Sequence, residues 1–239
     1  MTDEDGVILS VRGEAAVAVA PDAAVLDCSI AVWRDSRPDA LTAAATALDR
    51  LTADLSELGG VPLSAGTKRS TMTWSAFSAT TRAEREHDKQ TGRFELTGRV
   101  LAAVGVAVTV RDFVLLESLG RVLACHDDLN VRHVTWQVDD DNPGWATVRN
   151  EAIHAALQRG RDYAAALGVS LLGVEHVADT GLLGRSGENP RRVRAAALVA
   201  TGSGHDDGDV DTPSLDPVPQ ELSAVIEARL RATRADLPV

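Results

Sequence analysis

One place in the chain gathers residue types that can ligate a metal ion, because His126, Asp127 and Asp128 follow one another. Imidazole and carboxylate groups bind several divalent metals. These residues come directly after a predicted helix, where aspartate commonly forms caps and turns. None of the six histidines has the HExxH or HxH spacing of a metal-binding motif. We therefore expect a turn here and no metal site.

A second acidic run, His205–Asp211, alternates aspartate with other residues like the start of a calcium-binding loop. Such a loop needs glycine at its sixth position for a sharp turn and glutamate at its twelfth as a bidentate ligand. When Asp207 is taken as the first position, the sixth is Thr212 and the twelfth is Val218. The run therefore belongs to a solvated, mobile acidic loop, which we expect to span residues 202–219.

The sequence contains no motif of a familiar catalytic site. It has no GxSxG, no P-loop and no GxGxxG after a predicted strand. Ser186 lies near Glu188 and Arg191, but no spacing links it to a histidine. A histidine distant in sequence can still approach a serine in the fold, so a hydrolytic site stays open. We predict a protein that is not an enzyme, with no catalytic, cofactor-binding or metal-binding residues and no cofactor.

The two cysteines, Cys28 and Cys125, lack CxxC and Cys/His spacing. Cys28 falls within an alternating strand pattern and Cys125 near a helix end. Free cysteines are among the most buried residue types, so we expect two reduced, largely buried thiols. Tryptophans within or beside predicted strands are expected to pack in the core or at an edge. They are Trp33, Trp74, Trp136 and Trp145.

Alternation of apolar and polar residues predicts strands. The predicted strands are 7–11, 15–19, 24–33, 68–81, 94–110, 131–138, 171–178 and 193–200. The charged stretch 82–92 is expected to be an exposed hairpin tip. Residues 222–230 alternate as well, which favours a closing strand, although their Glu and Ala residues leave a helix open.

Two long helices are expected to lie across these strands. The first, 38–58, is capped by Asp35 or Ser36. Its apolar residues fall at three- and four-residue spacings and form one stripe. The stripe contains Leu41, Ala44, Ala45, Leu48, Leu51, Leu55 and Leu58. The second long helix is rich in alanine and ends at Gly168, and a shorter helix follows the cap residue Asp112.

Composition limits the class of protein. Hydrophobic residues make up 44% of the 239 residues but aromatic residues only 3%, so the core must consist of Ala, Val and Leu. A net charge of −11 repels phosphate backbones and anionic lipids, which argues against a nucleic-acid partner. The acidic N-terminal residues lack the apolar run of a signal peptide, and no stretch approaches the ~20 apolar residues of a membrane helix. We expect a cytoplasmic protein without membrane insertion.

Several motifs in order resemble the SIMPL-domain family, also known as domain of unknown function 541, which includes periplasmic immunogenic proteins. The motifs are Val11-x-Gly13-Glu14-Ala15, Pro21-Asp22-Ala23, Arg149-Asn150-Glu151-Ala152, Ala166-Leu167-Gly168, Leu172-Gly173-Val174 and Pro217-Val218-Pro219. Together they span about residues 7–230. The second glycine usual in the opening motif is Ala15 here. Most relatives are exported, whereas no signal peptide is expected in this sequence. The resemblance therefore does not imply a role in the cell envelope.

The resemblance implies an α+β fold in which long helices pack on antiparallel sheets, and a tendency to self-assemble. It supplies no catalytic residues. We expect a single SIMPL-like domain over 1–239, with 7–110 and 111–235 as alternative sub-domains. The order of strands followed by a helix occurs twice along the chain, which suggests two related halves. Gly13 is expected to permit a bulge or a close backbone approach between the first strands.

The leading functional hypothesis is a non-enzymatic, self-associating scaffold or interaction protein that forms a homo-oligomer. The alternative is a small-molecule-binding protein or enzyme with a pocket between sheet and helices, with Arg149, Glu151 or His133 among its polar groups. A third hypothesis is an adaptor that recruits a partner chain through a sheet edge such as the closing strand. The sequence identifies neither the biological process nor the oligomer size.

Overall fold

The structure, a computed structural model, describes residues 6–87, 94–179, 192–195 and 216–234. In this part of the chain three helices pack on largely antiparallel sheets, which confirms the predicted α+β class. The chain forms two compact units. Unit 1 comprises 1–20, 138–199 and 218–239, and unit 2 comprises 21–137 and 200–217.

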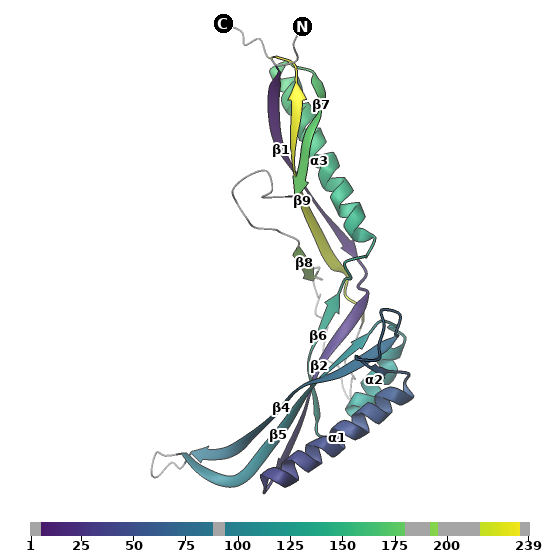
Figure 1. Ribbon diagram of the computed structural model, residues 1–239, viewed down its shortest axis with the longest axis vertical. Helices are drawn as coiled ribbons and strands as arrows, with labels where there is room; N and C mark the ends of the chain where they lie inside the picture. Colours follow the sequence, from purple (N-terminus) through teal and green to yellow (C-terminus); the bar gives the residue numbers. More distant parts are fainter. Residues whose placement is uncertain (1–5, 88–93, 180–191, 196–215, 235–239) are drawn as a thin grey trace, which may run out of the picture. The chain divides into compact units, whose positions relative to one another are not determined.

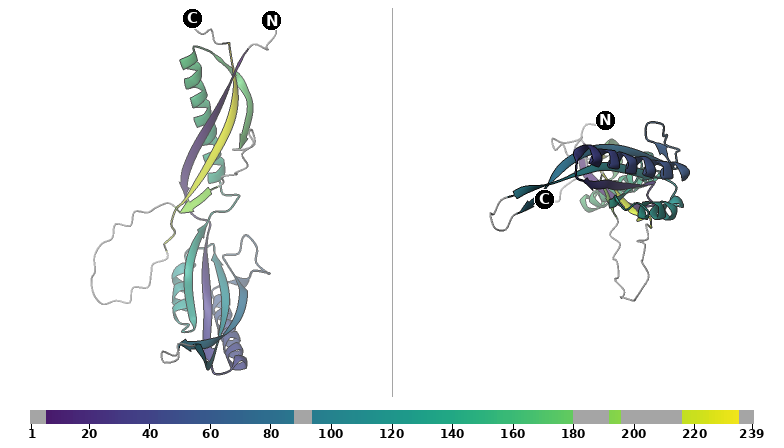
Figure 2. Two further views of the ribbon diagram at one scale, coloured as in Figure 1. Left: turned by 90° about the vertical axis from the view of Figure 1, so that its left-hand side faces the viewer. Right: turned by 90° about the horizontal axis from the view of Figure 1, so that it is seen from below.

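Unit 1 is built from strands at both ends of the chain. β1 (Val7–Val19) pairs antiparallel with β9 (Gln220–Ala232) along its entire length. β7 (Leu171–Asp179) and β8 (Arg192–Ala195) pair with the other side of β9. Figure 2 shows β1 and β9 running side by side. The closing segment is therefore a strand, as the alternation favoured, and not a helix.

Helix α3 (Gly144–Leu167) covers one face of this sheet, because a row of small side chains lets it lie close to the strands. The buried members of the row recur every four residues: Ala152, Ala156, Gly160 and Ala164. Gly13 of β1 lies beneath them, and a Cβ on Gly13 would be 1.9 Å from the carbonyl oxygen of Ala152. As predicted, the helix ends at Gly168, whose φ of 65° suits glycine.

The expectation for Gly13 is therefore corrected. β1 is one continuous strand instead of two, and its register with β9 has no bulge. The close approach at Gly13 is made to the backbone of α3 and not between the first two strands. A pattern read along one strand cannot reveal this, because the residues that crowd Gly13 lie more than a hundred positions away in the sequence.

Unit 2 contains a five-stranded sheet in the order β3-β4-β5-β2-β6. The strands are β2 (Ala23–Arg34), β3 (Val61–Pro62), β4 (Met72–His87), β5 (Phe94–Val110) and β6 (Leu129–Gln137). Helices α1 (Arg37–Glu57) and α2 (Leu115–Ala124) share one apolar core with this sheet (Figure 1). That core takes alternate residues of β2: Ala24, Leu26, Cys28, Ile30 and Val32.

Helix α1 begins where the sequence predicts, because the Ser36 hydroxyl oxygen accepts a hydrogen bond from the Asp39 amide at 3.2 Å. Its buried face confirms the predicted stripe at Ala44, Leu51 and Leu55, but Leu41 and Ala45 lie outside it. Ala40, Ala44 and Leu55 are fully buried, whereas the Leu41 side chain is 45% exposed. One residue corresponds to about 100° around a helix. The sheet therefore selects the face that contains Ala40 and leaves Leu41 outside.

The β4–β5 hairpin is longer than predicted. β4 continues through the charged residues 82–87, which the sequence suggested as part of a hairpin tip over 82–92. Cross-strand pairing with β5 carries it past this stretch, with irregularities between Ala76 and Ser78 and between Ala83 and Arg85. Residues 88–93 lie outside the described part of the chain.

The short helix α2 begins at Leu115, later than the predicted cap at Asp112 implies. An Asp112 carboxylate oxygen accepts a hydrogen bond from the Val114 amide at 3.2 Å, in the turn that precedes the helix.

The tryptophans pack largely as predicted. Trp145 is buried in unit 1, and Trp136 contacts the Phe113 ring edge-on in unit 2, with centroids 5.6 Å apart.

The unit boundaries differ from the alternative sub-domains 7–110 and 111–235, because the pairing of β1 with β9 unites the first and last strands.

Residues 216–219 of the predicted loop 202–219 are neither helix nor strand. Residues 202–215 lie outside the described part. None of the helices in the described ranges is long and apolar enough to cross a membrane.

Candidate functional site

A cavity of about 410 Å³ lies in unit 2 between α1, the turn that follows α2, and β2. Helical periodicity places Ala47, Arg50, Leu51 and Asp54 on the side of α1 that borders it. The turn contributes residues 125–129, and β2 contributes Ile30. The cavity thus has an apolar floor and a polar rim, the general composition of a binding site.

His126 and Asp54 join the two sides of this cavity. The His126 Nε2 atom lies 2.9 Å from a carboxylate oxygen of Asp54. The His126 side chain is 15% exposed and that of Asp54 is 44% exposed. The carboxylate therefore fixes the orientation of the imidazole ring from α1, 72 residues away in the sequence.

The predicted turn at His126 is present, because its carbonyl oxygen accepts a hydrogen bond from the Leu129 amide at 3.0 Å. Asp127 and Asp128 are exposed at the rim of the cavity. Within residues 6–87, 94–179, 192–195 and 216–234, no three His, Cys, Asp or Glu residues are placed to hold a metal ion. With three carboxylates against one arginine, the rim suits a cationic group above an apolar floor.

Sequence reasoning identified half of this site. It singled out His126, Asp127 and Asp128 but missed Asp54 and Arg50. Both missed residues lie on α1 at the border of the apolar stripe, beside its member Leu51, and the stripe pattern takes account only of apolar residues. The available signal was that Arg50 and Asp54 are four residues apart, so they share one helix face.

The polar residues suggested for a pocket do not line this cavity. His133 on β6 faces Asp27 of β2, with 4.0 Å between Nε2 and the nearest carboxylate oxygen. The other Asp27 oxygen is buried without a hydrogen-bond partner among the described residues. Arg149 and Glu151 belong to α3 of unit 1, where the Arg149 guanidinium lies 6.0 Å from the Trp145 ring centroid.

Two sequence candidates fall outside the described residues. They are the Ser186 group, with Glu188 and Arg191, and the acidic run His205–Asp211.

The two cysteines are free thiols, but only one is buried as expected. Cys28 is buried in the core of unit 2, whereas Cys125 is exposed at the cavity, so the expectation for Cys125 is wrong. Burial is the main cause that raises the pKa of Cys28 to about 11, with a further contribution from the Asp27 carboxylate and an opposing one from Arg132. Cys125 follows the last turn of α2, where the chain turns outward.

The two thiols are therefore expected to react at very different rates. An alkylating reagent at pH 8 should label Cys125 within minutes and leave Cys28 unlabelled, because attack requires an accessible thiolate. Intact-mass spectrometry should show one adduct on the folded protein and two adducts in urea. A Cys125→Ser variant that still takes up one equivalent when folded would contradict the burial of Cys28.

Comparison with known proteins places these features in a family. The SIMPL family model, described as protein of unknown function (DUF541), matches residues 9–230. No curated protein matches the chain. The matched residues include most of β1 and β9 in unit 1 and all of unit 2. The chain therefore belongs to the SIMPL family, as its motifs indicated.

Proposed function

We propose that the protein is a non-enzymatic scaffold that associates with copies of itself. The observation that carries the proposal is the surface of the β4–β5 hairpin. The chain has three phenylalanines, and two of them, Phe77 and Phe94, have side chains 55% and 68% exposed on this hairpin. Leu96, two residues from Phe94 on the same strand, is 67% exposed. Large apolar side chains grouped on a surface are typical of protein interfaces.

The sheet that carries the hairpin supports the proposal. Alternate residues of β2 pack into the core with α1 and α2, and the residues between them lie on the opposite face. No helix or strand of the described residues packs over that opposite face. Phe77 lies on that face, at an irregularity of β4. Its ring lies over Gly105, because a Cβ on Gly105 would be only 2.6 Å from the Phe77 Cζ atom.

The edge of this sheet is open as well. β3 pairs with β4 only at Thr73 and Trp74, so the outer edge of β4 beyond these residues has no partner strand in the described part of the chain. Residues 75–81 of that edge contain no charged residue and no proline. Charges and proline are the usual protection of an exposed edge strand. An edge without them is suited to contact another protein chain.

The proposal is tested by light scattering coupled to size exclusion over a concentration series from about 1 to 200 μM. A defined oligomer is expected, because burial of the exposed apolar side chains of Phe94 and Leu96 would favour association at about 25 cal/mol per Å² of apolar area. A monomer at every concentration would refute self-association. Leu96→Ser should shift the association midpoint to higher concentration, whereas Val114→Ser, at an exposed valine outside the hairpin, should not.

The cavity beside His126 favours a second candidate, the binding of a small molecule. Its volume is at the lower end of the range of about 300–1,000 Å³ for ligand pockets. A thermal-shift screen of small organic amines would test this candidate. A ligand that stabilises the protein but not an Asp54→Asn variant would support it, and the absence of any such ligand would remove it.

A further inference from the structure

The β4–β5 hairpin ends in a two-stranded extension that has no third strand. β2 pairs with β5 only as far as Val100. Beyond that point, residues 84–87 and 94–99, here called the arm, pair only with each other in the described part of the chain. Figure 1 shows these strands leaving the sheet. A two-stranded ribbon alone is marginally stable in water, so packing against another surface would stabilise the arm.

The root of the arm is fixed by its own contacts. Glu84 accepts a hydrogen bond from the Thr97 hydroxyl at 2.6 Å and forms an ion pair with Arg99 at 3.9 Å. The Arg99 guanidinium lies 5.6 Å from the centroid of the Trp33 ring on β2. These contacts hold the arm at a defined exit from the sheet and lower the entropy that docking would cost.

One face of the arm presents an apolar and a cationic group together. Arg85 and Leu96 are directly opposite each other in the β4–β5 ladder. Directly opposed residues point to the same side of a sheet, with Cβ atoms about 4.5–5.5 Å apart. Leu96 is largely exposed, and Arg85 has no ion-pair partner among the described residues.

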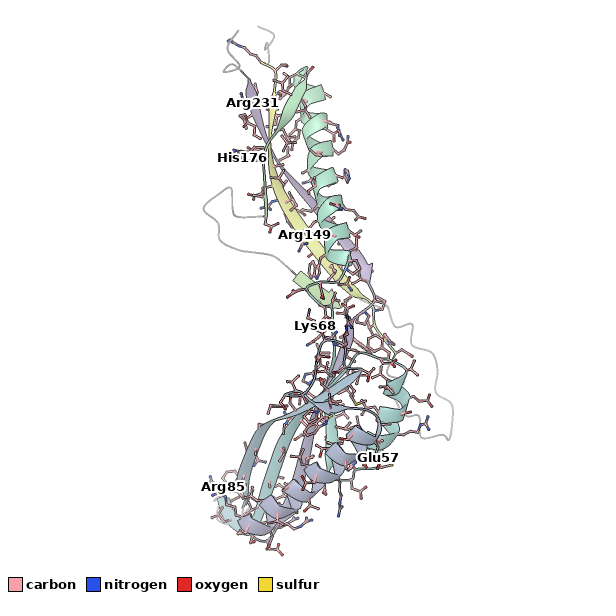
Figure 3. All side chains as sticks on the ribbon, turned by 45° about the vertical axis from the view of Figure 1, so that its right-hand side comes forward. Glu57, Lys68, Arg85, Arg149, His176 and Arg231 are labelled. Carbon is pink, nitrogen blue, oxygen red and sulfur yellow. The ribbon has the colours of Figure 1, made fainter. Side chains whose placement is uncertain are left out.

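The cavity of unit 2 has the complementary chemistry. Its floor includes Ile30, Leu51 and Leu129, and its rim carries the exposed carboxylates of Asp127 and Asp128. Neither aspartate has an ion-pair partner in the described ranges. Figure 3 labels Arg85 on the arm and Glu57 at the end of α1, at separate places on the unit. None of the residues that line the cavity belongs to the arm, so the arm and the cavity are different surfaces of the same unit.

Overall charge favours another copy as the occupant. The arm carries two basic residues, Arg85 and Arg99, against three acidic residues, so its net charge is −1 and the other −10 of the net charge of −11 resides in the rest of the chain. Two acidic copies repel each other over most of their surface. A nearly neutral arm with an accessible arginine approaches the acidic rim of another copy with little of that repulsion.

We propose that the arm of one copy docks in the cavity of a second copy, with Leu96 on the apolar floor and Arg85 at Asp127 and Asp128. This inference rests on the proposed self-association and specifies its interface. Because the two surfaces differ, the contact is heterologous. Repetition of such a contact produces a ring if the rotation closes and a filament if it does not.

Two variants that each damage one surface test the proposal. Arg85→Glu/Leu96→Glu removes the arm contact, and Asp127→Arg/Asp128→Arg removes the rim contact. Each variant alone is expected to associate at least tenfold more weakly than the wild type in sedimentation velocity. The matched controls Arg121→Glu/Leu41→Glu and Asp35→Arg/Asp49→Arg change the same charges at exposed positions of unit 2 and should retain wild-type association.

Mixing the two damaged variants gives the sharper result. The cavity variant still has an intact arm, and the arm variant still has an intact cavity. An equimolar mixture should therefore form a 1:1 dimer and nothing larger. A chain that combines Arg85→Glu with Asp127→Arg/Asp128→Arg should regain association, because the charges are exchanged. Circular dichroism of each variant establishes that it is folded.

The outcomes separate this inference from the proposed function. A wild-type protein that is monomeric throughout refutes self-association itself. A wild-type oligomer that both damaged variants retain refutes the arm-in-cavity contact but leaves the scaffold proposal standing. Damaged variants that dissociate and yield no dimer when mixed would also overturn the heterologous contact.

Discussion

Gly13→Ala is expected to lower the free energy of unfolding by about 3 kcal/mol, the upper end of the range for overpacked cores. The new Cβ would be 1.9 Å from the Ala152 carbonyl oxygen and 2.4 Å from the Ala156 backbone nitrogen. Both neighbours are backbone atoms of a helix, which cannot move aside as the end of a side chain can. α3 would have to lift from β1, and the apolar contacts along its small-residue row would weaken with it.

Thermal unfolding followed by circular dichroism measures this effect. In a protein of this size 1 kcal/mol corresponds to about 2–4 °C, so the midpoint should fall by about 6–12 °C. The two units need not unfold together, so calorimetry should show which transition moves. We expect the change in the transition that exposes Trp145 of unit 1.

Two other glycines provide graded controls. A Cβ on Gly160 would be 2.1 Å from the Leu230 Cδ1 atom, which is the end of a side chain, so Gly160→Ala should cost less than Gly13→Ala. A Cβ on Gly173 would meet nothing within 4 Å, and Gly173→Ala should leave the midpoint within about 2 °C of the wild type. Equal effects at all three positions would contradict the close packing of α3 on β1.

Leu55→Ala is expected to destabilise unit 2 by about 2–5 kcal/mol, because it removes a fully buried side chain and leaves a cavity in the core. Leu55 packs in the core that α1 shares with β2 and β5. Urea unfolding at fixed temperature, analysed by linear extrapolation, gives the free-energy difference between the variant and the wild type.

Leu41→Ala is the matched substitution on the same helix. The sequence pattern puts Leu41 and Leu55 in one apolar stripe, but the Leu41 side chain is 45% exposed. Its replacement should change stability by less than about 0.5 kcal/mol. A large loss at Leu41 would show that the buried face of α1 includes Leu41 as well, as the sequence pattern suggested.

Local features of the fold could be predicted because their causes are local. Ser36 caps the first long helix with an oxygen three residues from the amide it binds, and Gly168 ends the second by adopting a left-handed conformation. The alternation in 222–230 reflects a strand with one buried face, which is visible within nine residues. The family, too, could be identified from short motifs in a fixed order.

The candidate site could be predicted only in part. His126, Asp127 and Asp128 are neighbours in sequence, so their grouping was visible. Asp54, which orients His126, comes from another element and becomes a neighbour only after α1 packs on the sheet. The burial of the two thiols differed for the same reason. Cys28 lies in an alternating strand pattern and Cys125 near a helix end, but only the fold decides which side chain turns toward solvent.

The sequence by itself determined most of the helices and strands, since these follow from residue types within a few positions of one another, and its motifs identified the family, whose resemblance implied the α+β class. The tertiary structure alone decided which elements meet. It paired the first strand with the last, placed α3 against Gly13, and buried Ala40 of α1 while it left Leu41 exposed. These choices depend on the fit of surfaces more than a hundred residues apart or on the phase of a helix against a sheet, and neither is encoded in a local pattern.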